Sequence, residues 1–99
     1  MSFADSLKIP GLTHSLTNEE GKAPMLILIY EGKAKRNVML YGHLDKQPHM
    51  EGWREGTGPV TPAVIDGKLY GRGSSDDGYV PFAFLLALRN AINQGVELP

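Results

Sequence analysis

The chain has 99 residues, of which 41% are hydrophobic and 21% charged, and its formal net charge at pH 7 is −1. This length allows one domain at most, and a nearly neutral charge gives no support for binding to nucleic acid or to an anionic membrane surface. With no cysteine, no apolar run long enough for a membrane span and no recognisable signal peptide, the sequence excludes disulfides and thiolate metal ligands and favours a cytoplasmic protein.

The first 24 residues are weakly patterned, and no helix or strand is predicted there. Glu19 and Glu20 form an acidic pair, but they stand next to Gly21 without an apolar strand to present them. We therefore expect a solvated turn rather than a catalytic pair. His14 and the later His49 are likewise expected to be solvent-exposed loop residues.

Two short apolar runs follow. Met25–Tyr30 is continuously apolar and predicts a buried strand, and Val38–Tyr41 predicts a second one. Because neither run alternates strictly between polar and apolar residues, both strands are expected in a sheet that is covered on two faces, as in α/β folds.

The second predicted strand ends at Gly42, directly before His43 and Asp45. Side chains two residues apart on an extended backbone point the same way, so these two can lie side by side. A carboxylate beside an imidazole can accept its ring N–H and leave the other ring nitrogen free for a metal. The spacing therefore indicates a candidate metal ligand at a strand end, although a lone histidine is more often structural.

A loop rich in proline and glycine is expected over residues 46–63. It holds the only tryptophan, Trp53, which we expect to pack the loop down rather than to stack on a substrate. Next, Ala63–Ile65 and Lys68–Tyr70 flank an Asp-Gly pair, which is a strong signal for a two-residue hairpin turn.

The segment Gly71–Gly78 places Asp76 directly beside Asp77. Two adjacent ionised carboxylates repel each other, so a nearby positive charge is needed, and a divalent cation would supply it best. The alternative is a polar turn in which Asp77 caps the following helix.

That helix is predicted over Val80–Asn93, with Gly95 placed to end it. Its apolar residues recur at helical spacing and predict a buried stripe rather than a ligand site. The stripe consists of Phe84, Leu85, Leu88, Ala91 and Ile92.

Three parts of the sequence together resemble a known family. Tyr41–Pro48, then Trp53, then Asp66–Gly78 resemble the co-catalytic di-zinc metallopeptidases, which include carnosine dipeptidase, glutamate carboxypeptidase, aminoacylase, acetylornithine deacetylase and succinyl-diaminopimelate desuccinylase. The match extends over about residues 24–94, and the dipeptidase and carboxypeptidase branch is the most similar.

The resemblance implies an α/β fold, as part of a three-layer α/β/α catalytic domain with a mostly parallel sheet. It implies His43 as a zinc ligand, Asp45 as the catalytic carboxylate that orients and polarises the site, and Asp76 as a ligand that bridges two zinc ions. Asp77 would stand beside the bridging residue across a cis peptide bond. Such a centre, with Co²⁺ or Mn²⁺ as alternative ions, would hydrolyse a bond in a small peptide by activating water.

Two features depart from the family pattern. Gly78 and Tyr79 stand where the family commonly has Lys-Gly, and the family's general base and remaining ligands lie beyond the last helix. Residues 1–99 are therefore expected to form part of a catalytic domain, inactive alone, without the rest of that domain and the lid domain through which such enzymes often form homodimers.

Two alternatives remain open at this point. The chain could be a truncated, non-catalytic binding or regulatory module on the same scaffold. A nucleotide-binding loop is disfavoured, because Asp76 and Asp77 would repel a phosphate at the glycine-rich turn.

Overall fold

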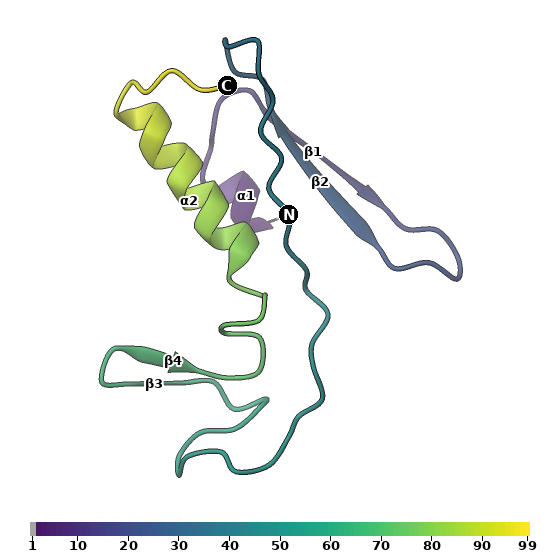
Figure 1. The fold of residues 1–99 in the computed structure, drawn as a ribbon, viewed down its shortest axis with the longest axis vertical. Coiled ribbons are helices and arrows are strands. Elements are labelled where there is room, and N and C mark those ends of the chain that lie inside the picture. Colours follow the sequence, from purple (N-terminus) through teal and green to yellow (C-terminus); the bar gives the residue numbers. More distant parts are fainter. Residues whose placement is uncertain (1) are drawn as a thin grey trace. The chain divides into compact units, whose positions relative to one another are not determined.

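The computed structural model describes residues 2–99, which form two compact units, each with its own set of contacts (Figure 1). One unit contains the chain up to Met39 together with Leu85–Pro99, and the other contains Leu40–Phe84. In chain order the elements are α1 (Ser2–Ser6), β1 (Leu12–Thr17), β2 (Met25–Tyr30), β3 (Ala63–Ile65), β4 (Lys68–Tyr70) and α2 (Val80–Asn93).

In the first unit, β1 and β2 form an antiparallel hairpin whose register runs from Leu12 opposite Tyr30 to Thr17 opposite Met25. The strand predicted over Met25–Tyr30 is confirmed with the same bounds. Neither α1 nor β1 was predicted. His14 lies in β1 rather than in a loop, and its Nε2 is 2.9 Å from Oδ1 of Asp5. Glu19 and Glu20 lie in the exposed turn of this hairpin, as expected.

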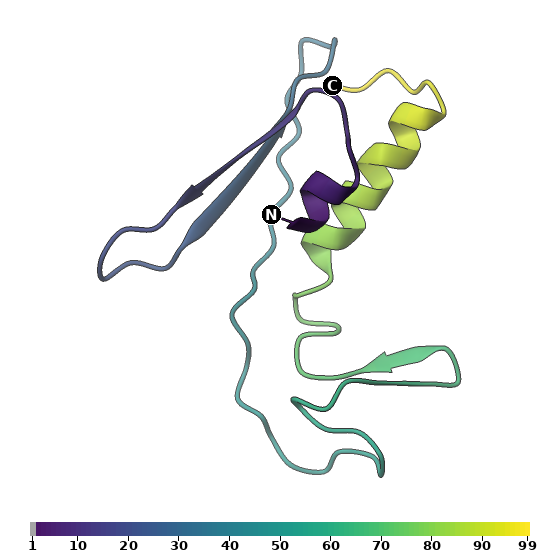
Figure 2. The same ribbon diagram turned by 180° about the vertical axis from the view of Figure 1, so that it is seen from behind.

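A small hydrophobic core holds the first unit together. Its buried members are Ala4 from α1, Ile9 from the loop that follows, and Leu85 from α2. The two helices lie side by side in both ribbon views (Figures 1 and 2). The half-buried side chains packed on this core are Phe3, Leu7, Leu12, Leu28, Tyr30, Leu88 and Ile92.

The expectation that β2 is covered on both faces is wrong. Leu28 and Tyr30 pack on the core, whereas Met25 and Ile29 are each 53% exposed. The expected mostly parallel sheet is also not found among residues 2–99, where both two-stranded sheets are antiparallel. The reason is that adjacent strands joined by a short turn pair with each other, whereas parallel pairing needs a long crossover. What these residues show is a mixed helix-and-strand fold.

The predicted strand over Val38–Tyr41 is also wrong, because this segment has no regular secondary structure. A strand is defined by its hydrogen-bonded neighbour, and none of residues 2–99 pairs with this segment. Its apolar side chains consequently face solvent, and Met39 is 91% exposed.

Helix α2 has the bounds that were predicted. Its apolar stripe is buried at Leu85 and half-buried at Phe84 and Ala91. Gly95 ends the helix in the left-handed conformation, with φ of +70°. Its N–H donates to the carbonyl of Ile92 at 3.0 Å, and the N–H of Val96 donates to that of Ala91 at 3.0 Å. These paired bonds form a Schellman motif, which satisfies carbonyls that have no partner inside the helix.

In the second unit, β3 and β4 form the predicted hairpin with the predicted bounds. Asp66 and Gly67 make its turn with φ of +52° and +74°. Positive φ at both central positions is the type I′ geometry, which matches the right-handed twist of paired strands.

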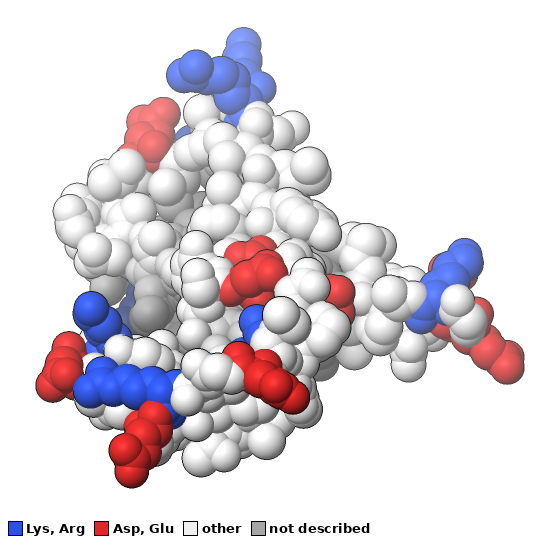
Figure 3. All heavy atoms as spheres, turned by 60° about the horizontal axis from the view of Figure 1, so that its bottom comes forward, with Lys and Arg blue, Asp and Glu red and all other residues white. Residues whose placement is uncertain are grey.

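Acidic and basic side chains are scattered over the face shown in Figure 3, most of which carries neither. This agrees with the formal net charge of −1. Within residues 2–99, neither helix has the length and apolarity needed to cross a membrane.

We expect Leu85→Ala to lower the free energy of unfolding by about 2–5 kcal/mol, because it leaves a cavity in the core of the first unit. The matched control is Leu86→Ala, whose side chain is 43% exposed, and which should change stability by less than about 1 kcal/mol. Urea denaturation followed by circular dichroism measures both. Equal losses would show that Leu85 does not contribute the core contact described above.

Candidate metal site

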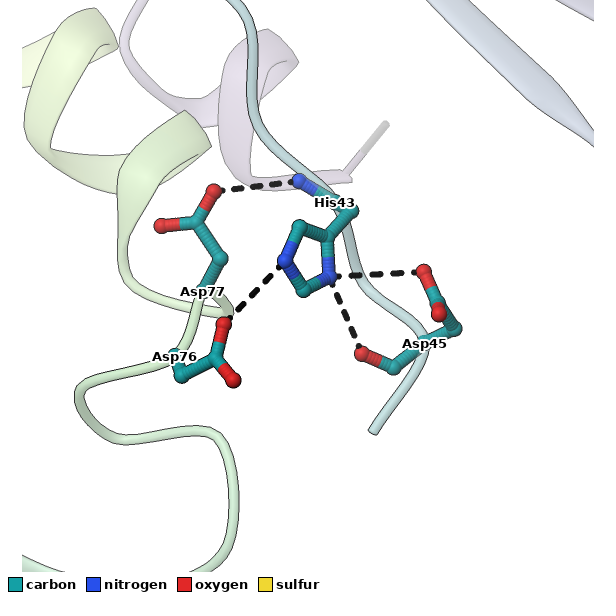
Figure 4. Close-up of polar contacts among 4 residues, drawn as sticks. All are labelled: His43, Asp45, Asp76 and Asp77. Carbon is teal, nitrogen blue, oxygen red and sulfur yellow. Dashed lines mark hydrogen bonds and ion pairs between the residues drawn. The ribbon is translucent and has the colours of Figure 1, made fainter. Parts of the chain in front are cut away.

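The segment that carries His43 lies close to the start of α2. A Cβ atom added to Gly42 would come within 2.5 Å of Cγ1 and 2.9 Å of Cβ of Val80, so only glycine fits there. Directly beyond it, the backbone N–H of His43 donates to Oδ2 of Asp77 at 3.2 Å (Figure 4). These contacts hold the extended segment against the turn that precedes the helix.

Asp76 and Asp77 lie in a turn closed by backbone hydrogen bonds. The N–H of Gly78 donates to the carbonyl of Gly73 at 3.0 Å, and the N–H of Val80 donates to that of Asp77 at 3.0 Å. The peptide bond between Asp76 and Asp77 is cis, as the resemblance implied. The carboxylate of Asp77 accepts the N–H of His43, and α2 begins three residues later, so its observed role is to fix the histidine rather than to cap the helix.

The ring of His43 lies between two acidic residues (Figure 4). Its Nε2 is 3.1 Å from Oδ1 of Asp76. On the opposite edge, Nδ1 is 3.2 Å from the backbone carbonyl of Asp45 and 3.4 Å from its Oδ1. The carboxylate of Asp45 is 92% exposed, so the carbonyl makes the closer contact. A proton on Nδ1 would therefore be held by Asp45, which leaves the lone pair of Nε2 directed at Asp76.

This arrangement raises the pKa of His43 above its ordinary value. The largest cause is the hydrogen bond from the ring to the Asp45 carbonyl, and the carboxylates of Asp45, Asp76 and Asp77 add to it, while burial acts in the opposite direction. Each of these contacts with Asp45, Asp76 and Asp77 favours the protonated ring. A metal cation that binds the ring nitrogen would have to displace that proton.

The donor pair fits a zinc ion in chemistry and in spacing. Zinc in proteins takes imidazole nitrogen and carboxylate oxygen at about 2.0–2.2 Å, which puts neighbouring ligand atoms of a tetrahedron about 3.3–3.5 Å apart. The 3.1 Å between Nε2 of His43 and Oδ1 of Asp76 is close to that spacing. Within residues 2–99, however, no group of three or more His, Cys, Asp or Glu side chains could hold a metal ion. Catalytic zinc sites commonly use three protein ligands.

The loop predicted over residues 46–63 is irregular up to residue 62, because Ala63 begins β3. Trp53 makes hydrogen bonds within this loop. The indole Nε1 donates to the carbonyls of His49 at 3.0 Å and Met50 at 3.2 Å. The guanidinium of Arg72 lies 5.5 Å from the centre of the indole ring and also donates to the His49 carbonyl at 3.1 Å. The role of Arg72 was not predicted, because its partners are 19 and 23 residues away in the sequence. The side chain of His49 is exposed, as expected.

Comparison with protein families decides the class of this chain. The family model described as Peptidase family M20/M25/M40 matches residues 39–99, which is more than half of the chain and includes His43, Asp45, Asp76 and Asp77. The chain belongs to this peptidase family. Family membership implies an α/β peptidase domain, hydrolase chemistry and a metal cofactor, as the resemblance in the sequence indicated.

Individual proteins with names of peptidases and related hydrolases are also similar to this chain. A Beta-Ala-His dipeptidase of Rattus norvegicus is 47% identical over 54% of this chain and 11% of its own length. A Cys-Gly metallodipeptidase of Candida albicans is 40% identical over 98% of this chain and 23% of its own length. A succinyl-diaminopimelate desuccinylase of Zymomonas mobilis is 36% identical over 86% of this chain and 23% of its own length. The chain thus spans a quarter or less of the length of these relatives.

We expect Gly42→Ala to weaken the site, because its Cβ would clash with the buried, β-branched Val80 and would lie 3.2 Å from Oδ2 of Asp77. The cost should be about 1–3 kcal/mol, as for other overpacked positions. Gly58→Ala is the control, since a Cβ there meets nothing closer than 3.6 Å. Thermal denaturation of both variants measures the difference, and an equally stable Gly42→Ala would refute the close approach.

We expect the pKa of His43 in the metal-free protein to lie above about 6.5, the ordinary value for histidine. A raised pKa stabilises the folded state below the unfolded-state value, and this contribution is lost as the pH rises through the folded-state value. Asp76→Asn should lower the pKa, because it removes one attracting charge, while Asp66→Asn in the distant hairpin turn should leave it unchanged. Titration of the ring resonances by NMR tests this, and equal shifts in both variants would contradict it.

Proposed function

We propose that this chain provides two ligands, His43 and Asp76, to the metal centre of a zinc-dependent dipeptidase or carboxypeptidase-type enzyme. The observation that carries the proposal is the 3.1 Å contact between Nε2 of His43 and Oδ1 of Asp76. The imidazole and the carboxylate come into contact from segments more than thirty residues apart, in a chain that belongs to a family of peptidases. A non-catalytic module on the same scaffold is not favoured, because it would have no need for this donor pair.

Asp45 and Asp77 orient His43, one of the two proposed metal ligands. In this proposal the Asp45 carbonyl accepts a hydrogen bond from the N–H at Nδ1, which leaves the lone pair of the neutral imidazole on Nε2. The carboxylate of Asp77 holds the backbone of His43, which fixes where the ring starts. Asp45 is the proposed catalytic carboxylate, because its Oδ1 lies 3.4 Å from Nδ1 of the proposed metal ligand.

Asp76 is proposed as the ligand shared by two zinc ions, with Co²⁺ or Mn²⁺ as alternative ions. Its second carboxylate oxygen has no ion-pair partner among residues 2–99 and is available for a second cation. The chemistry that zinc supplies when bound is Lewis-acid polarisation of a peptide carbonyl and a lower pKa for water. The remaining ligands and the general base would come from other parts of a longer protein.

We propose a small peptide as the substrate, because the relatives are named for Beta-Ala-His and Cys-Gly dipeptides. In this proposal, residues 1–99 form part of a three-layer α/β/α catalytic domain. The whole enzyme is proposed to be cytoplasmic and homodimeric, without nucleic-acid or membrane partners.

The test measures bound zinc and peptidase activity in the full-length protein. His43→Ala and Asp76→Ala should each lower activity on Beta-Ala-His and Cys-Gly by at least about 100-fold and lower the zinc content, since even residues that only support a ligand cost 10–100-fold. His49→Ala, an exposed histidine in the same unit, is the matched control and should have little effect. A chelator should abolish activity and added zinc should restore it.

Full activity and full zinc content in His43→Ala would overturn the proposal. Activity that resists the chelator would overturn the metal chemistry even if both variants were inactive.

A further inference from the structure

Lys46 lies across the turn that carries the two aspartates. A Cβ atom on Gly73 would come within 2.4 Å of Cε, 2.5 Å of Cδ and 2.8 Å of Nζ of Lys46. A Cβ on Gly78 would come within 2.7 Å of the same Nζ. The outer half of this lysine side chain therefore rests on the backbone at both glycines.

These two glycines are the ends of the turn. The N–H of Gly78 donates to the carbonyl of Gly73 at 3.0 Å, and Asp76 and Asp77 lie between them. Glycine has the largest conformational freedom of all residues, and Gly73 uses it, with φ of +91°. A turn anchored at two glycines has little side-chain packing of its own, so a side chain laid across both ends restricts it.

The lysine comes from the segment that carries His43. Along that segment His43 and Asp45 face the metal site, whereas Leu44 and Lys46 line a hollow of about 550 Å³ together with Gly73 and Gly78. The metal site is thus supported on one side by the bond from His43 to Asp77 and on the other by Lys46.

The hydrocarbon part of the side chain makes the contact at Gly73, where Cε and Cδ are the nearest atoms, whereas Nζ is the nearest Lys46 atom at Gly78. Within residues 2–99, no carboxylate lies within ion-pair distance of the Lys46 ammonium. Lysine often covers a surface with its methylene groups and keeps its ammonium in water. Packing of the methylene groups on Gly73, rather than an ion pair, is therefore what acts on the turn.

We propose that Lys46 is a positioning residue for the metal site: its methylene chain packs on Gly73, at one end of the turn, and holds Asp76 at its distance from His43. This role rests on the proposed metal function. Leu44 and Lys46 contribute nothing to the ligand set itself, so the effect of Lys46 on metal binding passes through the turn.

The experiment compares Lys46→Ala, Lys46→Met and the control Lys68→Ala in the full-length protein. Methionine keeps an unbranched chain of similar length without the charge, and Lys68 is an exposed lysine of β4 in the same unit. The first measurement is Co²⁺ affinity, with the visible absorption spectrum of the bound ion. The second is hydrogen–deuterium exchange of peptides covering residues 73–78 in the metal-free protein.

We expect Lys46→Ala to weaken Co²⁺ binding by about 10-fold or more, to change the absorption spectrum and to speed up exchange at the Gly78 amide. Lys46→Met and Lys68→Ala should behave like the unmodified protein in both measurements. Unchanged affinity and exchange in Lys46→Ala would overturn the proposal. A Lys46→Met variant as impaired as Lys46→Ala would also overturn it, because the ammonium rather than the chain would then be responsible.

The two measurements separate this role from the proposed function. If His43→Ala leaves Co²⁺ binding intact while Lys46→Ala alone speeds up exchange, the metal assignment fails and the packing of Lys46 on the turn stands. If His43→Ala abolishes binding while Lys46→Ala changes neither measurement, the positioning role fails alone.

Discussion

The candidate metal site depends on the contacts that His43 makes with two adjacent carboxylates, those of Asp76 and Asp77. Asp76 and Asp77 are neighbours in sequence, so their charges repel unless each meets a positive group. His43 serves both: its backbone N–H faces the carboxylate of Asp77, and its ring faces that of Asp76. The same contacts join the extended segment before residue 46 to the turn before α2, and the approach of the His43 ring to Asp76 follows from that junction.

Close approach of backbones makes the junction possible. Gly42 lets the extended segment reach Val80, and Gly73 and Gly78 let the side chain of Lys46 lie on the turn. A side chain at any of the three would occupy space that is already filled. The glycines therefore determine how near the imidazole comes to the carboxylate, although none of them has a functional group.

Features governed by neighbouring residues could be predicted from the sequence. The Asp66-Gly67 turn, helix α2 with its end at Gly95, and β2 all have the bounds that local patterns indicated. In contrast, the segment at Val38–Tyr41 has the composition of a strand but lacks a pairing partner, and β1, with its mixed sequence, is a strand because β2 pairs with it. A strand forms only where a second strand pairs with it, so composition alone gave the wrong prediction for both segments.

The sequence by itself determined the chemistry: His43 and Asp45 at the spacing of an extended chain, the adjacent Asp76 and Asp77 in a glycine-rich turn, and the family motif that they form. Only the tertiary structure decided that Nε2 meets Asp76, that the Asp45 carbonyl lies closer to the ring than its carboxylate does, and that Lys46 covers the turn. The contact between His43 and Asp45 joins residues two positions apart, but the other contacts join residues about thirty positions apart. Their distances depend on how two segments pack, which no local pattern encodes.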